Sequence, residues 1–146
     1  MMHSETAVTI AAPPRAIYDV VANVEGWPRI LPHYRYVRRT GDGSLAMAAR
    51  RGWIPVRWWA RVEGDPLAPA LRFRHVAGWT RGMEVRWSFT PCQGGTRVAI
   101  VHDLDFRVLP LAREWIARRV IGDFFVDAIA RRTLACVKAL MEARPV

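Results

Sequence analysis

Turn signals recur at short intervals through the middle of this 146-residue chain, and they constrain its fold more than any other feature. Between residues 34 and 106, apolar and β-branched runs are separated by "GDGS", "EGDPLAPA", "GWTRG" and "PCQGG". Connections this short join antiparallel strands, because a parallel pair needs a crossover of a dozen or more residues. The sequence therefore predicts a meander of strands at 34–40, 45–51, 54–62, 71–77, 83–90 and 96–106.

Helical patterns flank this meander on both sides. A strand at 6–10 ends at two prolines, and apolar residues then recur at helical spacing over 14–25. A second short helical turn is expected over 27–31. From 111 to about 141 the period is again helical, which predicts a helix of about thirty residues. Its apolar stripe is formed by Leu111, Trp115, Gly122, Phe125, Ile129, Thr133, Cys136 and Leu140.

Length and composition bound the class of protein. A chain of 146 residues fits a single domain, 1–146, with a genuine core. No run approaches the roughly 20 apolar residues of a membrane span, and the first residues do not resemble a signal peptide. The two cysteines, Cys92 and Cys136, lack metal-ligand or disulfide-framework spacing. We therefore expect a cytoplasmic location.

The net charge of +9 results from 22 basic and 13 acidic residues, and 21 of the basic residues are arginine. They occur as scattered singles and pairs in the polar positions of amphipathic segments, which is typical of a solvated surface. A nucleic-acid interface usually clusters such charges, so a nucleic-acid partner is not expected. Weak attraction to an anionic membrane stays open as an alternative.

Two segments resemble a known superfamily. "VTIAAPPRAIYDVVANVEGWPRILPHY" and "MEVRWSFTPCQGGTRVAIVHDLDF" are similar to START-like (SRPBCC) proteins, and in particular to polyketide cyclases/dehydrases and coenzyme Q-binding proteins. The resemblance covers essentially the whole chain. It implies an α+β helix-grip fold, in which a curved seven-stranded antiparallel sheet wraps around the long C-terminal helix, with two short helices after the first strand.

A curved sheet around one helix leaves a hollow, which the inward side chains must line. Strand alternation and the helical stripe direct a largely aromatic set inward, and this set suits an apolar or aromatic ligand. The proposed ligand-binding residues are Trp27, Phe73, Trp79, Trp87, Phe89, Phe106, Arg118 and Phe125. The alternative is that the tryptophans only fill space and that Arg118 extends to the helix edge.

Four residues are candidates for acid/base chemistry. His75 and His102 fall on the inward faces of their strands, and histidine titrates near neutral pH, although both could be core residues. The resemblance adds a cavity tyrosine and arginine, which fall on Tyr34 and Arg61. Strand alternation turns Arg61 outward unless a bulge intervenes. Neither a metal site nor a cofactor is expected.

Three functions fit these observations. The first is binding or transfer of a hydrophobic small molecule such as a polyketide, a quinone or a lipid. The second is an aromatase/cyclase or dehydratase that acts on poly-β-ketone intermediates. The third is a role for the basic surface at an anionic membrane. The sequence does not decide whether the protein is an enzyme, and it gives no oligomeric state.

Overall fold

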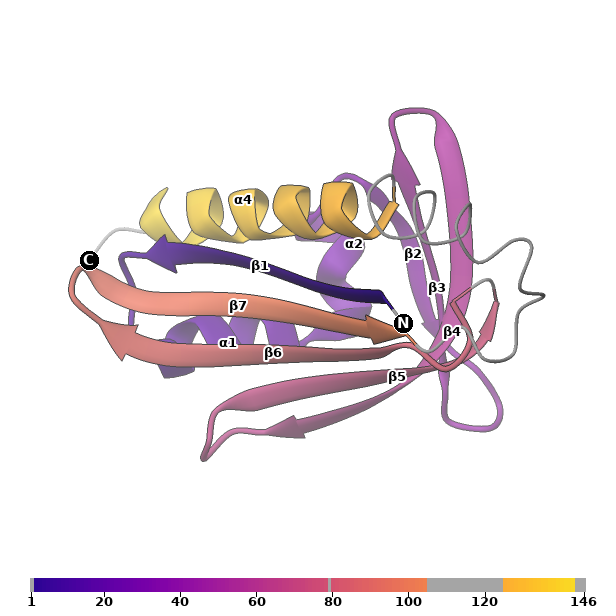
Figure 1. The fold of residues 1–146 in the computed structure, drawn as a ribbon, viewed down its shortest axis with the longest axis horizontal. Coiled ribbons are helices and arrows are strands. Elements are labelled where there is room, and N and C mark those ends of the chain that lie inside the picture. The colour runs from indigo at the N-terminus through magenta and orange to yellow at the C-terminus, as the bar shows by residue number, and fades with distance from the viewer. Residues whose placement is uncertain (1, 79, 105–124, 144–146) are drawn as a thin grey trace.

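A computed structural model describes residues 2–78, 80–104 and 125–143 of the chain (Figure 1). Within these residues, seven strands form one antiparallel sheet in the order β1-β7-β6-β5-β4-β3-β2. The strands are β1 (Met2–Ile10), β2 (Tyr34–Arg39), β3 (Leu45–Arg51), β4 (Ile54–Asp65), β5 (Ala70–Gly78), β6 (Glu84–Cys92) and β7 (Gly95–Leu104). The predicted meander and the α+β helix-grip class are confirmed.

Two short helices follow β1. Helix α1 (Pro14–Ala22) begins at a proline, whose missing N–H costs nothing in a first helical turn. A single 3₁₀ turn, η1 (Val24–Gly26), leads into α2 (Trp27–Ile30). Proline 32 follows α2 and ends the helical segment before β2. The predicted pair of short helices is therefore present, with the second helix one residue shorter than expected.

The C-terminal helix α4 (Asp127–Ala143) lies alongside β1, as Figure 1 shows. Its buried residues, Ala130, Thr133, Leu134, Val137 and Met141, recur at three- and four-residue spacing, as a one-sided helix requires. Residues 111–124 of the predicted helix lie outside the described part of the chain.

The sheet is bent, because β2, β3 and β4 run steeply across the direction of β1, β7 and β6 (Figure 1). Alternation places one face of each strand against the helices. On β6, Val85, Trp87 and Phe89 are buried while Arg86 and Ser88 are exposed. The inward face of this strand therefore agrees with the prediction.

One bulge changes the predicted face of β5. Trp59 pairs with Ala77 and Ala60 pairs with His75, so Val76 is an extra residue without a partner on β4. Beyond the bulge, Ala77 lies opposite the outward Trp59. Simple alternation from Phe73 and His75 predicts Ala77 on the same inward face, and this prediction is wrong because alternation cannot include an extra residue.

The end of β5 depends on Gly78. Its φ is +101°, and a Cβ atom built there would lie 2.9 Å from the Arg57 carbonyl oxygen and 3.0 Å from the Trp58 Cα. Only glycine combines this backbone conformation with so close an approach. Gly78 thus lets the β5–β6 turn close directly over Trp58.

Candidate functional site

A cavity lies between the inner face of the sheet and the helices, and in this structure its volume is about 70 Å³. Most of its lining is aromatic or aliphatic: Trp27, Met47, Val56, Trp58, Phe73, Met83, Val85, Trp87, Ile100, Phe125, Val126 and Ile129. Its polar lining consists of Tyr34, His75, Thr80, His102 and Thr133. Among the described residues, no carboxylate lines the cavity.

Trp27 is the centre of the aromatic wall. Its ring centroid lies 5.0 Å from that of Tyr34, 5.4 Å from Phe73 and 5.8 Å from Trp87. The indole Nε1 donates a hydrogen bond to the Val21 carbonyl oxygen at 2.9 Å, which fixes the ring against α1. Contacts of this kind add to the stabilisation from apolar burial, so Trp27 is a rigid part of the wall.

His75 is held in the wall by two contacts. Its ring stacks on Trp58, with centroids 5.5 Å apart and planes at 4°, and its Nδ1 lies 2.5 Å from the Thr80 hydroxyl oxygen. Thr80 is buried in the turn that Gly78 allows. Burial and, to a smaller extent, the neighbouring His102 together lower the pKa of His75 to about 3. The imidazole is therefore neutral at pH 7.

His102 presents an unsatisfied nitrogen. It lies on β7 between Ser4 of β1 and Val85 of β6, and its Nδ1 is buried without a hydrogen-bond partner among the described residues. Burial lowers its pKa to about 4, and the negative charges of Asp127 and Asp103 act in the opposite direction. Asp127 is held in place by a hydrogen bond from the Ser4 hydroxyl.

Tyr34 brings a phenol to the other end of the same cavity. It opens β2, and its ring packs edge-on against Trp58 at 6.0 Å and against His33 at 5.0 Å. Burial raises the pKa of Tyr34 far above its ordinary value, and a hydrogen bond with the Thr133 hydroxyl partly opposes this shift. Tyr34 is therefore a neutral hydrogen-bond donor at any physiological pH.

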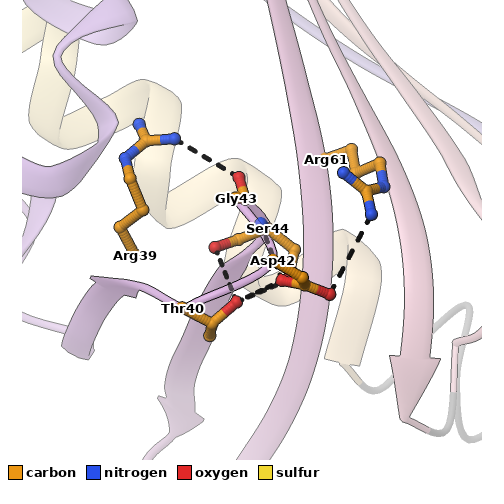
Figure 2. Close-up of polar contacts among 6 residues, drawn as sticks. All are labelled: Arg39, Thr40, Asp42, Gly43, Ser44 and Arg61. Atoms are coloured by element: carbon orange, nitrogen blue, oxygen red, sulfur yellow. Dashed lines mark hydrogen bonds and ion pairs between the residues drawn. The ribbon is translucent and has the colours of Figure 1, made fainter.

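Arg61 does not reach the cavity. Its side chain is exposed on the outer face of β4, where Nη2 lies 3.9 Å from Oδ2 of Asp42 (Figure 2). Hydrogen bonds from Thr40 and Ser44 lower the pKa of Asp42 below its usual range. The bulge that could have turned Arg61 inward lies on β5 and not on β4, so the alternation of β4 is unbroken. Arg61 is thus separated from the other three acid/base candidates.

The remaining candidates divide into three groups. Trp27, Phe73, Trp87 and Phe125 line the cavity. Phe89 does not: it is buried next to Trp87 and packs edge-on against Tyr18 of α1 at 5.8 Å. Trp79, Phe106 and Arg118 lie outside the described residues.

Sequence reasoning missed three residues that complete the polar sites, namely His33, Thr80 and Thr133. Thr133 was visible as a hydroxyl in the apolar stripe of the last helix, and His33 directly precedes Tyr34. Thr80 could not be found by pattern, because its position depends on the bulge and the turn. The one sequence signal that could have identified a polar site residue was therefore the hydroxyl of Thr133 on an otherwise apolar helix face.

Charge outside the cavity is arranged in exposed pairs. Arg72 lies 3.4 Å from Glu84, Arg86 lies 3.3 Å from Asp103, and Arg39 lies 2.9 Å from Glu25. Such pairs contribute little to stability and are typical of a solvated surface.

No helix in the described part of the chain is long and apolar enough to cross a membrane. Among the same residues, no group of His, Cys, Asp or Glu is arranged to hold a metal ion. Attraction to anionic membranes stays a prediction.

Comparisons with known proteins place this geometry in context. The model of a family described as "Polyketide cyclase / dehydrase and lipid transport" matches residues 10–129. The granaticin polyketide synthase bifunctional cyclase/dehydratase of Streptomyces violaceoruber is 34% identical over an alignment of length 107, which covers 68% of this chain and 33% of that protein. The corresponding actinorhodin protein of Streptomyces coelicolor is 30% identical over an alignment of length 142, which covers 91% of this chain and 42% of that protein. This chain thus spans less than half the length of both relatives.

Solved structures agree on the fold. The Zhui aromatase/cyclase from Streptomyces sp. R1128 superimposes with a TM-score of 0.82 at 22% identity, covering 97% of this chain and 94% of that one. The di-domain aromatase/cyclase BexL gives a TM-score of 0.71 at 27% identity, covering 97% of this chain and 47% of that one. A START superfamily protein from Mycobacterium smegmatis gives 0.70 at 15% identity, covering 97% of this chain and 98% of that one.

Proposed function

We propose a function from the premise that this chain belongs to the polyketide cyclase/dehydrase and lipid transport family, whose model matches residues 10–129. The function that the site supports best is cyclisation and dehydration of a poly-β-ketone chain. This was the alternative to simple binding in the sequence analysis, and the two bifunctional cyclase/dehydratase relatives favour it.

One observation carries the proposal: a phenol and two neutral imidazoles line the same apolar cavity. The rings of Tyr34 and His75 both contact Trp58, which places the acid and a base within the span of one indole. Poly-β-ketones need both groups, because enolisation removes a proton from carbon while the attacked carbonyl gains one. An apolar wall strengthens each of these interactions by excluding water.

The proposed aldol step begins when His102 or His75 takes a proton from a methylene carbon between two carbonyls. The resulting enolate carbon bonds to a second carbonyl carbon, and that oxygen takes the Tyr34 proton. In the dehydration, the Tyr34 phenolate removes a second proton from carbon and the imidazolium protonates the departing hydroxyl. The net change is the loss of one water molecule, and both side chains return to their starting states.

The low pKa values of the histidines are compatible with this role. Burial disfavours a positive charge on both rings, and the neighbouring His102 adds to this effect at His75. An enolate formed beside either ring supplies the missing negative charge and makes protonation of the imidazole more favourable. The bases therefore become stronger as the negative charge that they create develops.

The size of the cavity sets a condition on binding. Ligand pockets usually measure about 300–1,000 Å³, whereas this cavity measures about 70 Å³. A polyketide must therefore displace wall residues, and Met47 and Met83 are the most adaptable of these because methionine is unbranched and flexible. The displaced wall residues would hold the polyketide in one conformation and so select which carbons react in the cyclisation.

A reconstituted polyketide synthase tests the proposal. The purified protein is added to a ketosynthase system that releases a poly-β-ketone chain, and the products are separated by liquid chromatography with mass detection. We expect the spontaneous product mixture to be replaced by one cyclised compound that has lost water. An unchanged mixture at saturating protein would contradict the proposal.

Binding without chemistry is the second candidate, and the predominantly apolar lining favours it. Native mass spectrometry of the protein purified from its host would show an intact apolar molecule bound in one-to-one ratio. Recovery of that molecule unaltered, together with an unchanged product mixture in the reconstituted system, would support a carrier.

A further inference from the structure

The hydroxyl of Thr133 joins three groups that come from separate parts of the fold. His33 Nε2 lies 2.8 Å from Thr133 Oγ1, and Thr133 Oγ1 lies 2.7 Å from the Ile129 carbonyl oxygen, to which it donates. The Tyr34 hydroxyl is also hydrogen-bonded to Thr133. His33 is 1% exposed, so the whole group is shielded from bulk water.

The direction of the hydrogen bond from His33 follows from its neighbours. Thr133 Oγ1 has a single proton, which it donates to the Ile129 carbonyl oxygen. The hydrogen bond between Thr133 Oγ1 and His33 must therefore be donated by Nε2, which carries the proton. The other ring nitrogen, Nδ1, is then the bare one, in agreement with its lack of a hydrogen-bond partner among the described residues.

The proton of Thr133 is free to change partners. In α4, the Ile129 carbonyl also accepts the main-chain N–H of Thr133 by ordinary helical geometry, so it does not depend on the hydroxyl. Rotation of the hydroxyl would redirect its proton to the Tyr34 oxygen, while His33 continues to donate to Thr133. Each group in the resulting series donates one hydrogen bond and accepts another, apart from His33 at its start.

We propose, on the basis of the function proposed above, that His33 is a positioning residue that directs the Tyr34 proton toward the substrate. The donor series runs from His33 Nε2–H to Thr133, from Thr133 to the Tyr34 oxygen, and from the Tyr34 hydroxyl to the substrate carbonyl oxygen. Hydrogen bonds in such a series polarise one another, which strengthens the last donor. His33 neither touches the substrate nor exchanges a proton with it.

The series explains how a deeply buried phenol can act as an acid. Burial alone opposes formation of the phenolate, and the Thr133 contact acts against that effect. A donor aimed at the Tyr34 oxygen stabilises the negative charge that appears when the proton moves to the substrate. His33 keeps that donor in place because it supplies the hydrogen bond that Thr133 accepts.

Nuclear magnetic resonance tests the donor series without a substrate. Long-range ¹H–¹⁵N spectra of the protein at pH 7 should show His33 in the neutral Nε2–H tautomer. The ¹³Cζ signal of Tyr34, assigned with Tyr34→Phe, should move in Thr133→Val and His33→Leu and stay near its original position in Thr133→Ser and His33→Gln. An Nδ1–H tautomer, or a Tyr34 signal that is the same in all four variants, would overturn the proposal.

A double-mutant cycle then tests its use in catalysis. His33→Leu should lower kcat about tenfold with little change in KM, and His33→Gln, which keeps an N–H donor, should recover most of the rate. In the Tyr34→Phe background the same His33→Leu change should alter the rate less than about twofold. An equal loss in both backgrounds would show a merely structural role and overturn the proposal. Should His33→Leu fail to fold, Thr133→Val replaces it in the cycle.

The two experiments separate this inference from the proposed function. A protein that leaves poly-β-ketones unchanged refutes the cyclase, yet its His33 tautomer and Tyr34 signal still decide whether the donor series exists. A cyclase whose rate is insensitive to His33 refutes the inference and leaves the function standing.

Discussion

The two ends of the cavity differ in how their polar groups are satisfied. Each end holds one buried imidazole nitrogen without a partner in the described structure, but only His102, at the end formed with His75 and Thr80, lines the cavity, whereas His33 lies behind the wall. At the tyrosine end, formed by Tyr34, Thr133 and His33, a connected set of hydrogen bonds leads away from the cavity into the protein. In the proposed reaction the histidine end supplies the base and the tyrosine end supplies the acid.

The largest expected effect is on stability in acid, where both ends are tested together. The pKa values of His33, His75 and His102 are lowered to about 4, 3 and 4 in the folded state, against 6.5 for ordinary histidine. The unfolded chain therefore binds protons first as the pH falls. Their stabilisation is fully present above pH 6.5 and is lost toward pH 4, by about 2–3 kcal/mol for each histidine at pH 4.5.

Urea denaturation between pH 7 and pH 4.5 measures this loss. The free energy of unfolding should decrease over that interval. In His75→Gln this decrease should be smaller by the contribution of one histidine. A midpoint that stays constant in the wild-type protein would mean that these imidazoles are already charged or already exposed.

Removal of the Tyr34 hydroxyl should be the strongest single change in activity. Tyr34→Phe keeps the ring packed against Trp27 and Trp58 but removes the donor, so we expect kcat to fall about 100-fold. The matched control is Tyr36→Phe on the same strand, because Tyr36 lies outside the cavity beside Arg38. Equal values of kcat in Tyr34→Phe and Tyr36→Phe would show that Tyr34 is not the acid.

A smaller loss is expected at the histidine end. His102→Gln keeps a polar side chain of similar size but cannot accept a proton from carbon, so kcat should fall about tenfold, with His75 supplying the remaining rate. His3→Gln is a suitable control, since His3 is exposed on the neighbouring strand. If His102→Gln were as active as the wild type, the unsatisfied nitrogen would have no part in the reaction.

The smallest effect is expected on the outer face of the sheet. Arg61→Gln removes a long, exposed ion pair with Asp42, so the free energy of unfolding should change by less than about 0.5 kcal/mol. The cyclisation rate should stay within about twofold of the wild type. A loss of activity above tenfold would instead show that Arg61 reaches the substrate in the bound state.

The sequence predicted those features that depend on local pattern. Alternation alone placed Trp87 inward and Arg61 outward, because β4 and β6 keep an unbroken period of two. It failed at Ala77, where one extra residue in β5 reverses the face. Helical spacing identified the last helix, and a motif resemblance identified the fold around it.

The polar partners of the site could not be predicted in the same way. Thr80 meets His75 because a bulge and a glycine turn bring them together, and Thr133 meets His33 across 100 residues of sequence. Neither contact follows from spacing along one element. The volume of the cavity was equally inaccessible, because it depends on how the large rings settle against one another.

The stacking of Trp58 on His75 has a further consequence for a ligand that enters the cavity. Because Trp58 lies flat on His75, a guest that separates the pair must replace an aromatic contact with one of its own. A guest with a planar π face can offer such a contact, and a saturated chain has none to offer. A change in tryptophan emission that is lost in Trp58→Phe would report a guest at this pair.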